Sequence, residues 1–211
     1  MTAILFDLDG TLLNTLDDLA DAVNVTLSHF GCPPRTREQV RQFVGNGAER
    51  LIRLALPGKA GDPPVGETLD YFKDYYAANA QHKTCPYAGI LEALAEIRQV
   101  FPVAIVSNKP DRAVKTLCGQ YFGDVYARGE SSDCPRKPAP DMVHKAMAAI
   151  GAERCIYVGD SEVDVETAKN AGVPCLSVLW GFRDRQTLEK AGADHFCQTP
   201  ADLLKTLKEM I

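Results

Sequence analysis

Carboxylate, hydroxyl and amine side chains follow three short apolar runs of the chain. The first run ends in Asp7-Leu8-Asp9-Gly10-Thr11 and the second in Ser107-Asn108-Lys109. A later run ends in Gly159-Asp160-Ser161, with Asp164 four residues beyond Asp160, and Arg136-Lys137-Pro138 lies between the last two groups. Carboxylates bind hard cations or act as nucleophiles, and ammonium and hydroxyl groups hold phosphate oxygens. These residue types therefore favour chemistry on a phosphate ester.

Repulsion among the carboxylates points to a metal ion. Three carboxylates near one point raise one another's pKa values, and a divalent cation relieves that repulsion. Magnesium accepts one or two carboxylates together with a substrate phosphate. Lys137 would supply a point charge for the phosphate, and the Ser107 hydroxyl with the backbone N–H groups after it would donate to its oxygens. A single Asp at a strand end is commonly a turn residue, so the inference depends on the joint, ordered occurrence.

The elements that must position these groups are short buried strands separated by helices. Continuous apolar runs are typical of strands in a parallel sheet that is covered on both faces. Four such runs are Ala3–Phe6, Pro102–Val106, Arg154–Val158 and Pro174–Leu179. Helical patterns follow at Gly89–Val100, Asp111–Tyr121, Pro140–Ile150, Glu162–Ala171 and Pro200–Met210. The alternation predicts an α/β fold with a Rossmann-like, doubly wound parallel sheet, whose carboxyl edge would gather the polar groups.

One segment breaks the alternation and predicts a helical insert. Thr15 with Asp18 three residues later resembles a capping box, and apolar residues from Leu16 to Phe30 mark one helical face. Further helices are expected at Arg37–Phe43, Ala48–Leu56 and Glu67–Gln81. We therefore predict a catalytic core of residues 1–14 and 84–211, and a helical cap of residues 15–83 inserted after the first strand.

Composition excludes several classes of protein. The 211 residues include 45% hydrophobic and 24% charged residues with a formal net charge of −5, which is ordinary for a globular protein. The acidic balance, without a run of five Lys or Arg residues, argues against binding to nucleic acid. The apolar runs are far shorter than the ~18–20 residues of a membrane helix. The start of the chain lacks a basic region typical of a signal peptide, and seven scattered cysteines indicate reduced thiols, so a cytoplasmic location is expected.

The ordered motifs resemble those of the haloacid dehalogenase superfamily of phosphohydrolases. Asp7-Leu8-Asp9-Gly10-Thr11-Leu12 resembles the first motif, Ser107 the second, Lys137 the third, and Gly159-Asp160 with Asp164 the fourth. The resemblance covers the whole chain, and it implies that Asp7 is the nucleophile and Asp9 the general acid and base.

The same resemblance implies the remaining site residues. Magnesium would be bound by Asp7, the Asp9 backbone carbonyl and Asp160, and Asp164 would orient the metal shell or Lys137. Lys137 would also take part in catalysis. The residues implied for phosphate binding are Gly10, Thr11, Ser107, Asn108 and Lys137.

Within the superfamily, three segments are most similar to phosphoglycolate phosphatases. They are Phe43-Val44-Gly45-Asn46-Gly47-Ala48, Val106-Ser107-Asn108-Lys109 and Leu179-Trp180-Gly181-Phe182. This similarity implies magnesium-dependent hydrolysis of 2-phosphoglycolate to glycolate and phosphate. Asn46, Gly47 and Arg50 would then bind the leaving group, because a substrate carboxylate suits a helix N-terminus. The alternative is that this loop only caps the helix after it.

Other functions remain open at this stage. The same residues suit a phosphatase of a nucleotide, a sugar phosphate or pyrophosphate, and less well a sugar phosphomutase. A phosphorylated receiver-like signalling domain also combines acidic residues, a hydroxyl and a Lys, but it lacks a second Asp two residues after the first and an insert of this size. An inactive relative would lack a motif residue. The expected partner is a small phosphorylated substrate, without nucleic acid or membrane, and the chain is expected to be a monomer or homodimer.

Overall fold

The computed structural model describes all 211 residues, and the chain folds into two compact units. The core unit comprises Met1–Asn14 and Pro86–Ile211, and the inserted unit comprises Thr15–Cys85. The chain thus re-enters the core unit two residues later than the sequence predicts. The physical reason is that the backbone N–H and the hydroxyl of Thr84 both donate to the Asp18 carboxylate, which lies in the inserted unit.

A six-stranded parallel sheet forms the centre of the core unit, in the order β5-β4-β1-β6-β7-β8. Its strands are β1 (Thr2–Phe6), β4 (Val103–Pro110), β5 (Tyr126–Glu130), β6 (Arg154–Gly159), β7 (Cys175–Val178) and β8 (His195–Cys197). Strand β1 lies between β4 and β6, and its last four residues are fully buried, as a continuous apolar run in a doubly covered sheet requires. The predicted α/β class with a parallel sheet is confirmed.

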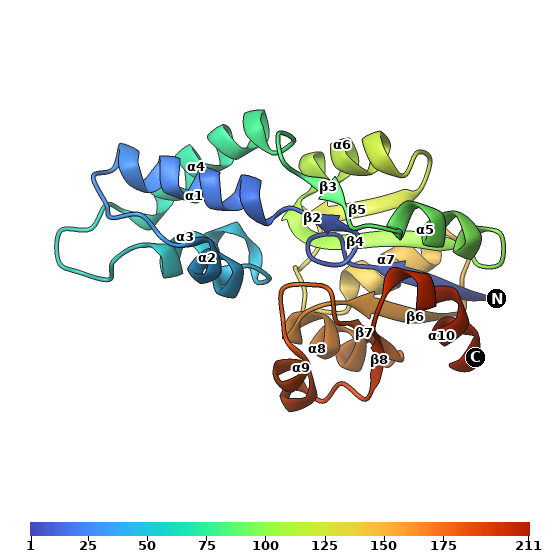
Figure 1. The fold of residues 1–211 in the computed structure, drawn as a ribbon. Helices are drawn as coiled ribbons and strands as arrows, with labels where there is room; N and C mark the ends of the chain where they lie inside the picture. The colour runs from blue at the N-terminus through green and yellow to red at the C-terminus, as the bar shows by residue number, and fades with distance from the viewer. The chain divides into compact units, whose positions relative to one another are not determined.

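Helices cover both faces of this sheet (Figure 1). Ile4 and Phe6 of β1 pack against α5 (Ile90–Arg98), α6 (Asp111–Tyr121) and α10 (Leu203–Glu209). Ala3 and Leu5 point to the other face and pack against α7 (Asp141–Ala149) and α8 (Glu162–Ala171). This division follows from the two-residue period of a strand. Helix α9 (Arg185–Ala191) packs on α8, and a 3₁₀ turn, η1 (Pro200–Asp202), precedes α10.

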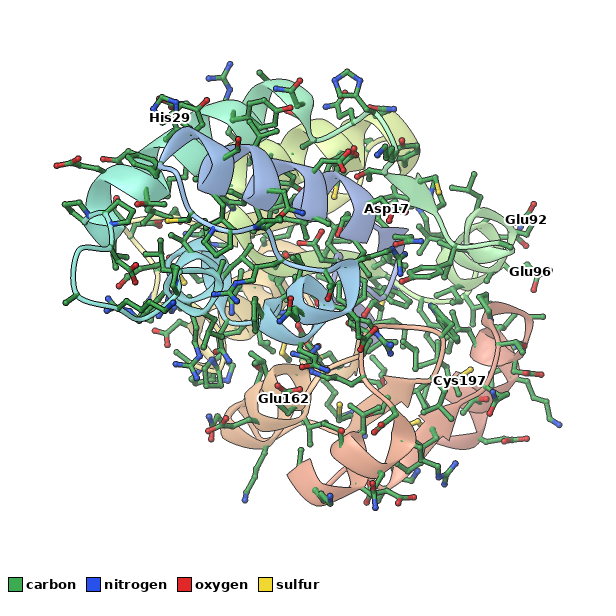
Figure 2. All side chains as sticks on the ribbon, turned by 60° about the vertical axis from the view of Figure 1, so that its left-hand side comes forward. Asp17, His29, Glu92, Glu96, Glu162 and Cys197 are labelled. Carbon is green, nitrogen blue, oxygen red and sulfur yellow. The ribbon has the colours of Figure 1, made fainter.

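The covering helices are amphipathic. Ile90, Leu94 and Ile97 of α5 are buried in the core cluster, whereas Glu92 and Glu96 point away from it into solvent (Figure 2). This spacing is the 3.6-residue period that the sequence shows for this segment. No helix in the structure has the length and apolar character needed to cross a membrane.

The inserted unit is built from helices (Figure 1). They are α1 (Leu16–His29), α2 (Arg37–Phe43), α3 (Gly47–Ala55) and α4 (Val65–Asn79). Two short strands, β2 (Leu13–Asn14) and β3 (Cys85–Pro86), pair where the chain passes between the units. Helix α2 begins with a capping box between Thr36 and Gln39, and His29, labelled in Figure 2, stacks on Tyr71 of α4 with 4.0 Å between ring centroids.

The capping box predicted at Thr15 and Asp18 is wrong. Thr15 precedes α1, but its side chain makes no capping hydrogen bond. The buried Asp18 carboxylate instead accepts hydrogen bonds from the backbone N–H groups of Lys83 and Thr84, at 3.0 and 2.8 Å, and from the Thr84 hydroxyl at 2.7 Å. Donors distant in sequence satisfy this carboxylate, so it joins the two chain segments that bound the inserted unit.

Candidate active site

The predicted motif residues lie at the carboxyl ends of three adjacent strands. Asp7 directly follows β1, Ser107 lies near the end of β4, and Asp160 directly follows β6. Because β1 lies between β4 and β6 in a parallel sheet, the three ends meet at one edge. The Asp7 backbone N–H donates to the carbonyl of Val158 at 2.8 Å, which fixes the turn out of β1.

Asp7 is a buried carboxylate beside a buried ammonium group. Its Oδ1 lies 2.8 Å from Nζ of Lys137 as an ion pair, outside hydrogen-bonding geometry. Burial raises the pKa of Asp7 from 3.8 to about 7; the positive charge of Lys137 opposes this shift, and the nearby Asp164 carboxylate adds to it. A buried carboxylate oxygen without a hydrogen bond is suited to contact a cation or an electrophile.

Lys137 is held at both its backbone and its ammonium group. Its Nζ lies 2.8 Å from Asp7 Oδ1 and donates to Asp164 Oδ1 at 2.8 Å and to the Tyr157 hydroxyl at 3.0 Å. Burial by itself would lower the pKa of Lys137, but the charges of Asp164 and Asp7 raise it well above its usual value. The side chain is therefore a fixed positive charge next to the Asp7 carboxylate.

The Asn108 side chain holds the backbone of Lys137 in place. Its Oδ1 accepts from the Lys137 backbone N–H at 2.7 Å, and its Nδ2 donates to the Lys137 carbonyl at 2.9 Å. The Asn108 amide has two N–H groups and only one of them serves this pair, so the predicted contact of Asn108 with phosphate stays a prediction. Both ends of the amide are used by one residue, so Asn108 joins the end of β4 to the Lys137 loop.

Asp164 is saturated with donors. Its Oδ1 accepts from Lys137 Nζ and from the Tyr157 hydroxyl at 3.2 Å. Its Oδ2 accepts from the backbone N–H groups of Asp160 and Ser161, at 3.2 and 3.1 Å, and from the Ser161 hydroxyl at 2.6 Å. Five donors leave little capacity for a metal ion, so the geometry gives this carboxylate an orienting role.

Asp160 lies within reach of the same point. Carboxylate oxygens of Asp7, Asp160 and Asp164 all lie within 4.8 Å of one another, so Asp7 and Asp160 are close enough to bind one divalent cation beside Asp164. Burial raises the pKa of Asp160 well above its usual value, and the charges of Asp164 and Asp7 add to the rise. Three buried carboxylates lie beside the single ammonium group of Lys137, so negative charge is in excess here. A bound cation would compensate this excess.

Two neighbours fix the Asp160 carboxylate. Thr11 Oγ1 donates to its Oδ1 at 3.1 Å, and the Phe182 backbone N–H donates to its Oδ2 at 2.6 Å. The predicted phosphate ligand Thr11 thus uses its hydroxyl on Asp160. The loop of Phe182 is tied in turn to α8, since Arg183 Nε donates to Glu162 at 2.8 Å, and Glu162 is labelled at the start of that helix in Figure 2.

Three glycines lie against the carboxylates of Asp160 and Asp164, which follow strand β6. A Cβ atom at Gly10 or at Gly181 would overlap with the side chain of Asp160. A Cβ atom at Gly159 would overlap with the side chain of Asp164. Gly10 also has a φ of +86°, which disfavours any other residue at this turn. The backbone therefore closes around these oxygens and leaves no room for a side chain.

Comparison with known proteins assigns the family. The model of haloacid dehalogenase-like hydrolases matches residues 4–178. The chain belongs to this family of hydrolases. It is 34% identical over 95% of its length to "Phosphoglycolate phosphatase 1" of Pseudomonas aeruginosa, covering 78% of that protein. It is 36% identical over 88% of its length to "Phosphoglycolate phosphatase" of Pseudomonas putida, covering 72% of that protein.

A solved structure shares the whole architecture. The crystal structure of a protein from Lactobacillus delbrueckii subsp. bulgaricus matches this haloacid dehalogenase-like hydrolase with a TM-score of 0.90 at 35% identity. The match covers 97% of each chain, which includes both the core unit and the inserted unit. The resemblance seen in the motifs is thereby confirmed for the whole chain.

Substitution of Gly181 tests whether the position of the Asp160 carboxylate matters for the activity of this hydrolase. We expect Gly181→Ala to push the Asp160 carboxylate aside, to weaken magnesium affinity roughly 10- to 100-fold and to lower kcat/KM by about 100-fold. Magnesium titration of turnover measures both effects. Gly119→Ala is the matched control, because its Cβ meets no atom within 4 Å; wild-type activity and up to about 1 kcal/mol of added stability are expected there. Equal activities of the two variants would contradict this role of Gly181.

The sequence predicts no role for two residues that contact the motif residues, Lys109 and Tyr157. Lys109 Nζ donates to both carboxylate oxygens of Asp9, at 2.9 and 3.2 Å, although the sequence gives it no role. Tyr157 lies within an apolar strand run, and its hydroxyl joins Lys137 to Asp164. Sequence alone could have indicated a role for Tyr157, because the hydroxyl of a tyrosine in a fully buried strand needs a hydrogen-bond partner.

The three predicted residues of the inserted unit lie at the start of α3. Asn46 precedes the helix, but its side chain makes no capping hydrogen bond. Gly47 has a φ of +81°, and Arg50 is exposed on the first turns of the helix. The Asn46 side chain therefore does not cap the helix, and the alternative that this loop is only the start of the helix stays open. Binding of a leaving group by Asn46, Gly47 and Arg50 stays a prediction.

Proposed function

We propose that this hydrolase is a magnesium-dependent phosphatase that acts through an aspartyl phosphate, with 2-phosphoglycolate as its substrate. The observation that supports this proposal most directly is the buried Asp7 carboxylate at the strand end, whose Oδ1 lies 2.8 Å from the ammonium group of Lys137. The substrate is taken from relatives named phosphoglycolate phosphatase that match most of this chain. The fixed charge of Lys137 and the neighbouring Asp160 suit a site for a phosphate dianion and its counter-cation.

Each chemical role falls to a residue at the edge of the sheet. An Asp7 oxygen attacks phosphorus while the bond to the leaving oxygen breaks, and Asp9 gives its proton to that oxygen. Asp9 then takes a proton from water, whose oxygen attacks phosphorus and releases Asp7. Lys137 and the Ser107 hydroxyl bind phosphate oxygens, and the backbone at Gly10 turns the chain so that Asp9 follows Asp7 at this edge.

The metal would be held by Asp7, Asp160 and the backbone carbonyl of Asp9. An Mg²⁺ ion held there would supply positive charge against the phosphoryl oxygens. Thr11 and Phe182 keep the Asp160 carboxylate in position, and Asp164 holds the backbone of Asp160 and the ammonium group of Lys137. These hydrogen bonds would hold the Asp160 ligand in its binding orientation also without the ion.

The raised pKa of Asp7 predicts a pH-dependent response to magnesium. Because burial raises the pKa of Asp7 from 3.8 to about 7, the unfolded chain loses this proton at a lower pH than the folded chain. The contribution of Asp7 to the free energy of unfolding without metal therefore falls as pH rises from about 4 to about 7. Mg²⁺ favours the ionised form, so we expect its stabilising effect on Tm to increase from pH 5.5 to pH 8, as thermal melts with and without Mg²⁺ would measure. A Tm increment that is constant with pH would contradict this prediction, and Asp7→Asn is the control that should flatten it.

Arg50 tests the predicted recognition of the substrate carboxylate. We expect Arg50→Ala to raise KM for 2-phosphoglycolate roughly 10-fold, since a hydrogen bond to a charged group is lost, and to leave KM for p-nitrophenyl phosphate unchanged. Arg53→Ala on the same helix is the matched control, because Arg53 pairs with Glu49 at the surface. An unchanged KM for 2-phosphoglycolate would remove Arg50 from the site.

The first experiment is phosphate release from 2-phosphoglycolate with and without Mg²⁺, beside a panel of nucleotides, sugar phosphates and pyrophosphate. Magnesium-dependent turnover with kcat/KM of roughly 10⁴ M⁻¹s⁻¹ or more, well above the panel, is the expected result. Faster turnover of another panel member would keep the mechanism and replace the substrate. No phosphate release from a folded protein would overturn the proposed phosphatase activity. A cytoplasmic location stays a prediction from the sequence.

A further inference from the structure

Each carboxylate of the first motif has its own buried lysine. Lys137 Nζ lies 2.8 Å from Asp7 Oδ1, and the two side chains are 2% and 10% exposed. Lys109 Nζ lies 2.9 Å from Asp9 Oδ1, and these side chains are 2% and 14% exposed. The family motifs account for the first pair and not for the second. A lysine almost removed from solvent is costly unless its charge is matched, and the Asp9 carboxylate supplies that match for Lys109.

The backbone of Lys109 is fixed as firmly as its side chain. Its N–H donates to the Ser107 hydroxyl oxygen at 3.3 Å. A Cβ atom at Gly129 of β5 would lie 2.5 Å from the Lys109 carbonyl oxygen, so the neighbouring strand closes directly against this residue. The Gly129 N–H donates in turn to Asp111 Oδ1 at 3.0 Å, two residues beyond Lys109. The ammonium group therefore projects from a rigid strand end.

The ammonium group of Lys109 contacts both carboxylate oxygens of Asp9. Nζ of Lys109 reaches both carboxylate oxygens, at 2.9 and 3.2 Å, across 100 residues of sequence. A charge placed between both oxygens restricts rotation of the carboxyl plane about the Cβ–Cγ bond. Asp9 lies in the loop after β1, whereas Lys109 belongs to β4. The Asp9 side chain is therefore held by a residue of strand β4 and not by its own loop.

We propose that Lys109 is a positioning residue that holds the Asp9 carboxyl group in line for its two proton transfers. This inference rests on the proposed function, in which Asp9 is the general acid and base. In the first step the Asp7–phosphorus bond forms, the bond from phosphorus to the leaving oxygen breaks, and the Asp9 proton passes to that oxygen. In the second step water forms a bond to phosphorus, the Asp7–phosphorus bond breaks, and a water proton passes to Asp9.

The two steps separate this role from a phosphate-binding role. A strongly basic alkoxide, such as that of glycolate, needs the Asp9 proton in order to leave, whereas p-nitrophenolate is a stable anion that leaves without it. Hydrolysis of the aspartyl phosphate needs Asp9 with either substrate. Loss of Lys109 therefore slows both steps with an alkyl phosphate and only the second step with p-nitrophenyl phosphate.

The experiment compares Lys109→Met and Lys109→Arg with wild type by rapid quench and stopped flow. We expect Lys109→Met to release one equivalent of p-nitrophenolate in the first turnover within about 3-fold of the wild-type rate, and then to turn over roughly 30- to 100-fold more slowly. Its first turnover of 2-phosphoglycolate falls by a similar 30- to 100-fold. Lys109→Arg keeps the charge and recovers part of both losses. Lys205→Met, at a highly exposed lysine, is the matched control and behaves as wild type.

A second measurement covers the case in which Lys109→Met folds poorly. In an Asp9→Asn background the aspartyl phosphate formed from p-nitrophenyl phosphate decays slowly, and Lys109→Arg slows its decay no further if Lys109 acts through Asp9. Equal first-turnover losses on both esters, an additive effect in the Asp9→Asn background, or no loss at all would each overturn the proposal. Wild-type turnover is read separately, so failure of the proposed function shows as an inactive wild type and not as a change at Lys109.

Discussion

Asp7→Asn is expected to abolish turnover and to leave the fold as stable as before, or more stable. The amide cannot form the aspartyl phosphate, so kcat should fall by roughly 10⁴-fold or more. Burial is the largest cause of the raised pKa of Asp7, which means that the folded protein opposes the charge. A neutral amide of nearly the same shape removes that penalty, and we expect an equal or higher Tm at pH 8. Activity and stability thus move in opposite directions.

Quenched reactions show which step Asp7→Asn removes. Wild type incubated with labelled substrate and stopped with acid should carry covalent phosphate, and Asp7→Asn should carry none. Asp9→Asn is the matched control two residues away, and it should accumulate the label when p-nitrophenyl phosphate is the substrate. Covalent phosphate on Asp7→Asn would show that another residue is the nucleophile. A large drop in its Tm would show that Asp7 is needed for folding, against the direction of its pKa.

Lys137→Met is expected to lower both activity and stability. The variant removes the ammonium group from Asp7, Asp164 and the Tyr157 hydroxyl at once, all of which are buried. Breaking a buried ion pair on one side leaves an unmatched charge, and the free energy of unfolding should fall by about 3–5 kcal/mol at pH 8. Turnover should fall by roughly 10³-fold or more, because the fixed charge at the phosphate site is lost.

The pH dependence separates this effect from a simple packing defect. Protonation relieves an unmatched carboxylate, so the stability lost in Lys137→Met should be partly regained between pH 8 and pH 5, as chemical denaturation at both values would measure. Lys205→Met at the surface is the control for the substitution itself. A loss of stability that is the same at both pH values would indicate lost packing and would contradict the charge argument.

Strong local patterns made most of the core fold predictable from sequence. Three helices, Arg37–Phe43, Asp111–Tyr121 and Glu162–Ala171, have the bounds that the sequence predicts. The sequence does not predict the elements that lack such patterns. Strand β5 is an edge strand whose sequence Tyr-Ala-Arg-Gly-Glu contains two charged residues, and β8 has three residues. Helix α9 is likewise not predicted by the sequence. Edge strands bury less of each side chain, and their apolar signal is correspondingly weak.

The sequence by itself determined the α/β class, the family and the set of residues that gather at the edge of the sheet. Each of these depends on local order, namely apolar runs followed by short polar motifs. Only the tertiary structure decided how the polar groups pair. It matched Lys109 with Asp9 across 100 residues, and it used Asn108 to hold the backbone of Lys137. Such pairs follow from the strand order β4-β1-β6 and from which buried donors need acceptors, and neither is written in the spacing of residues along one segment.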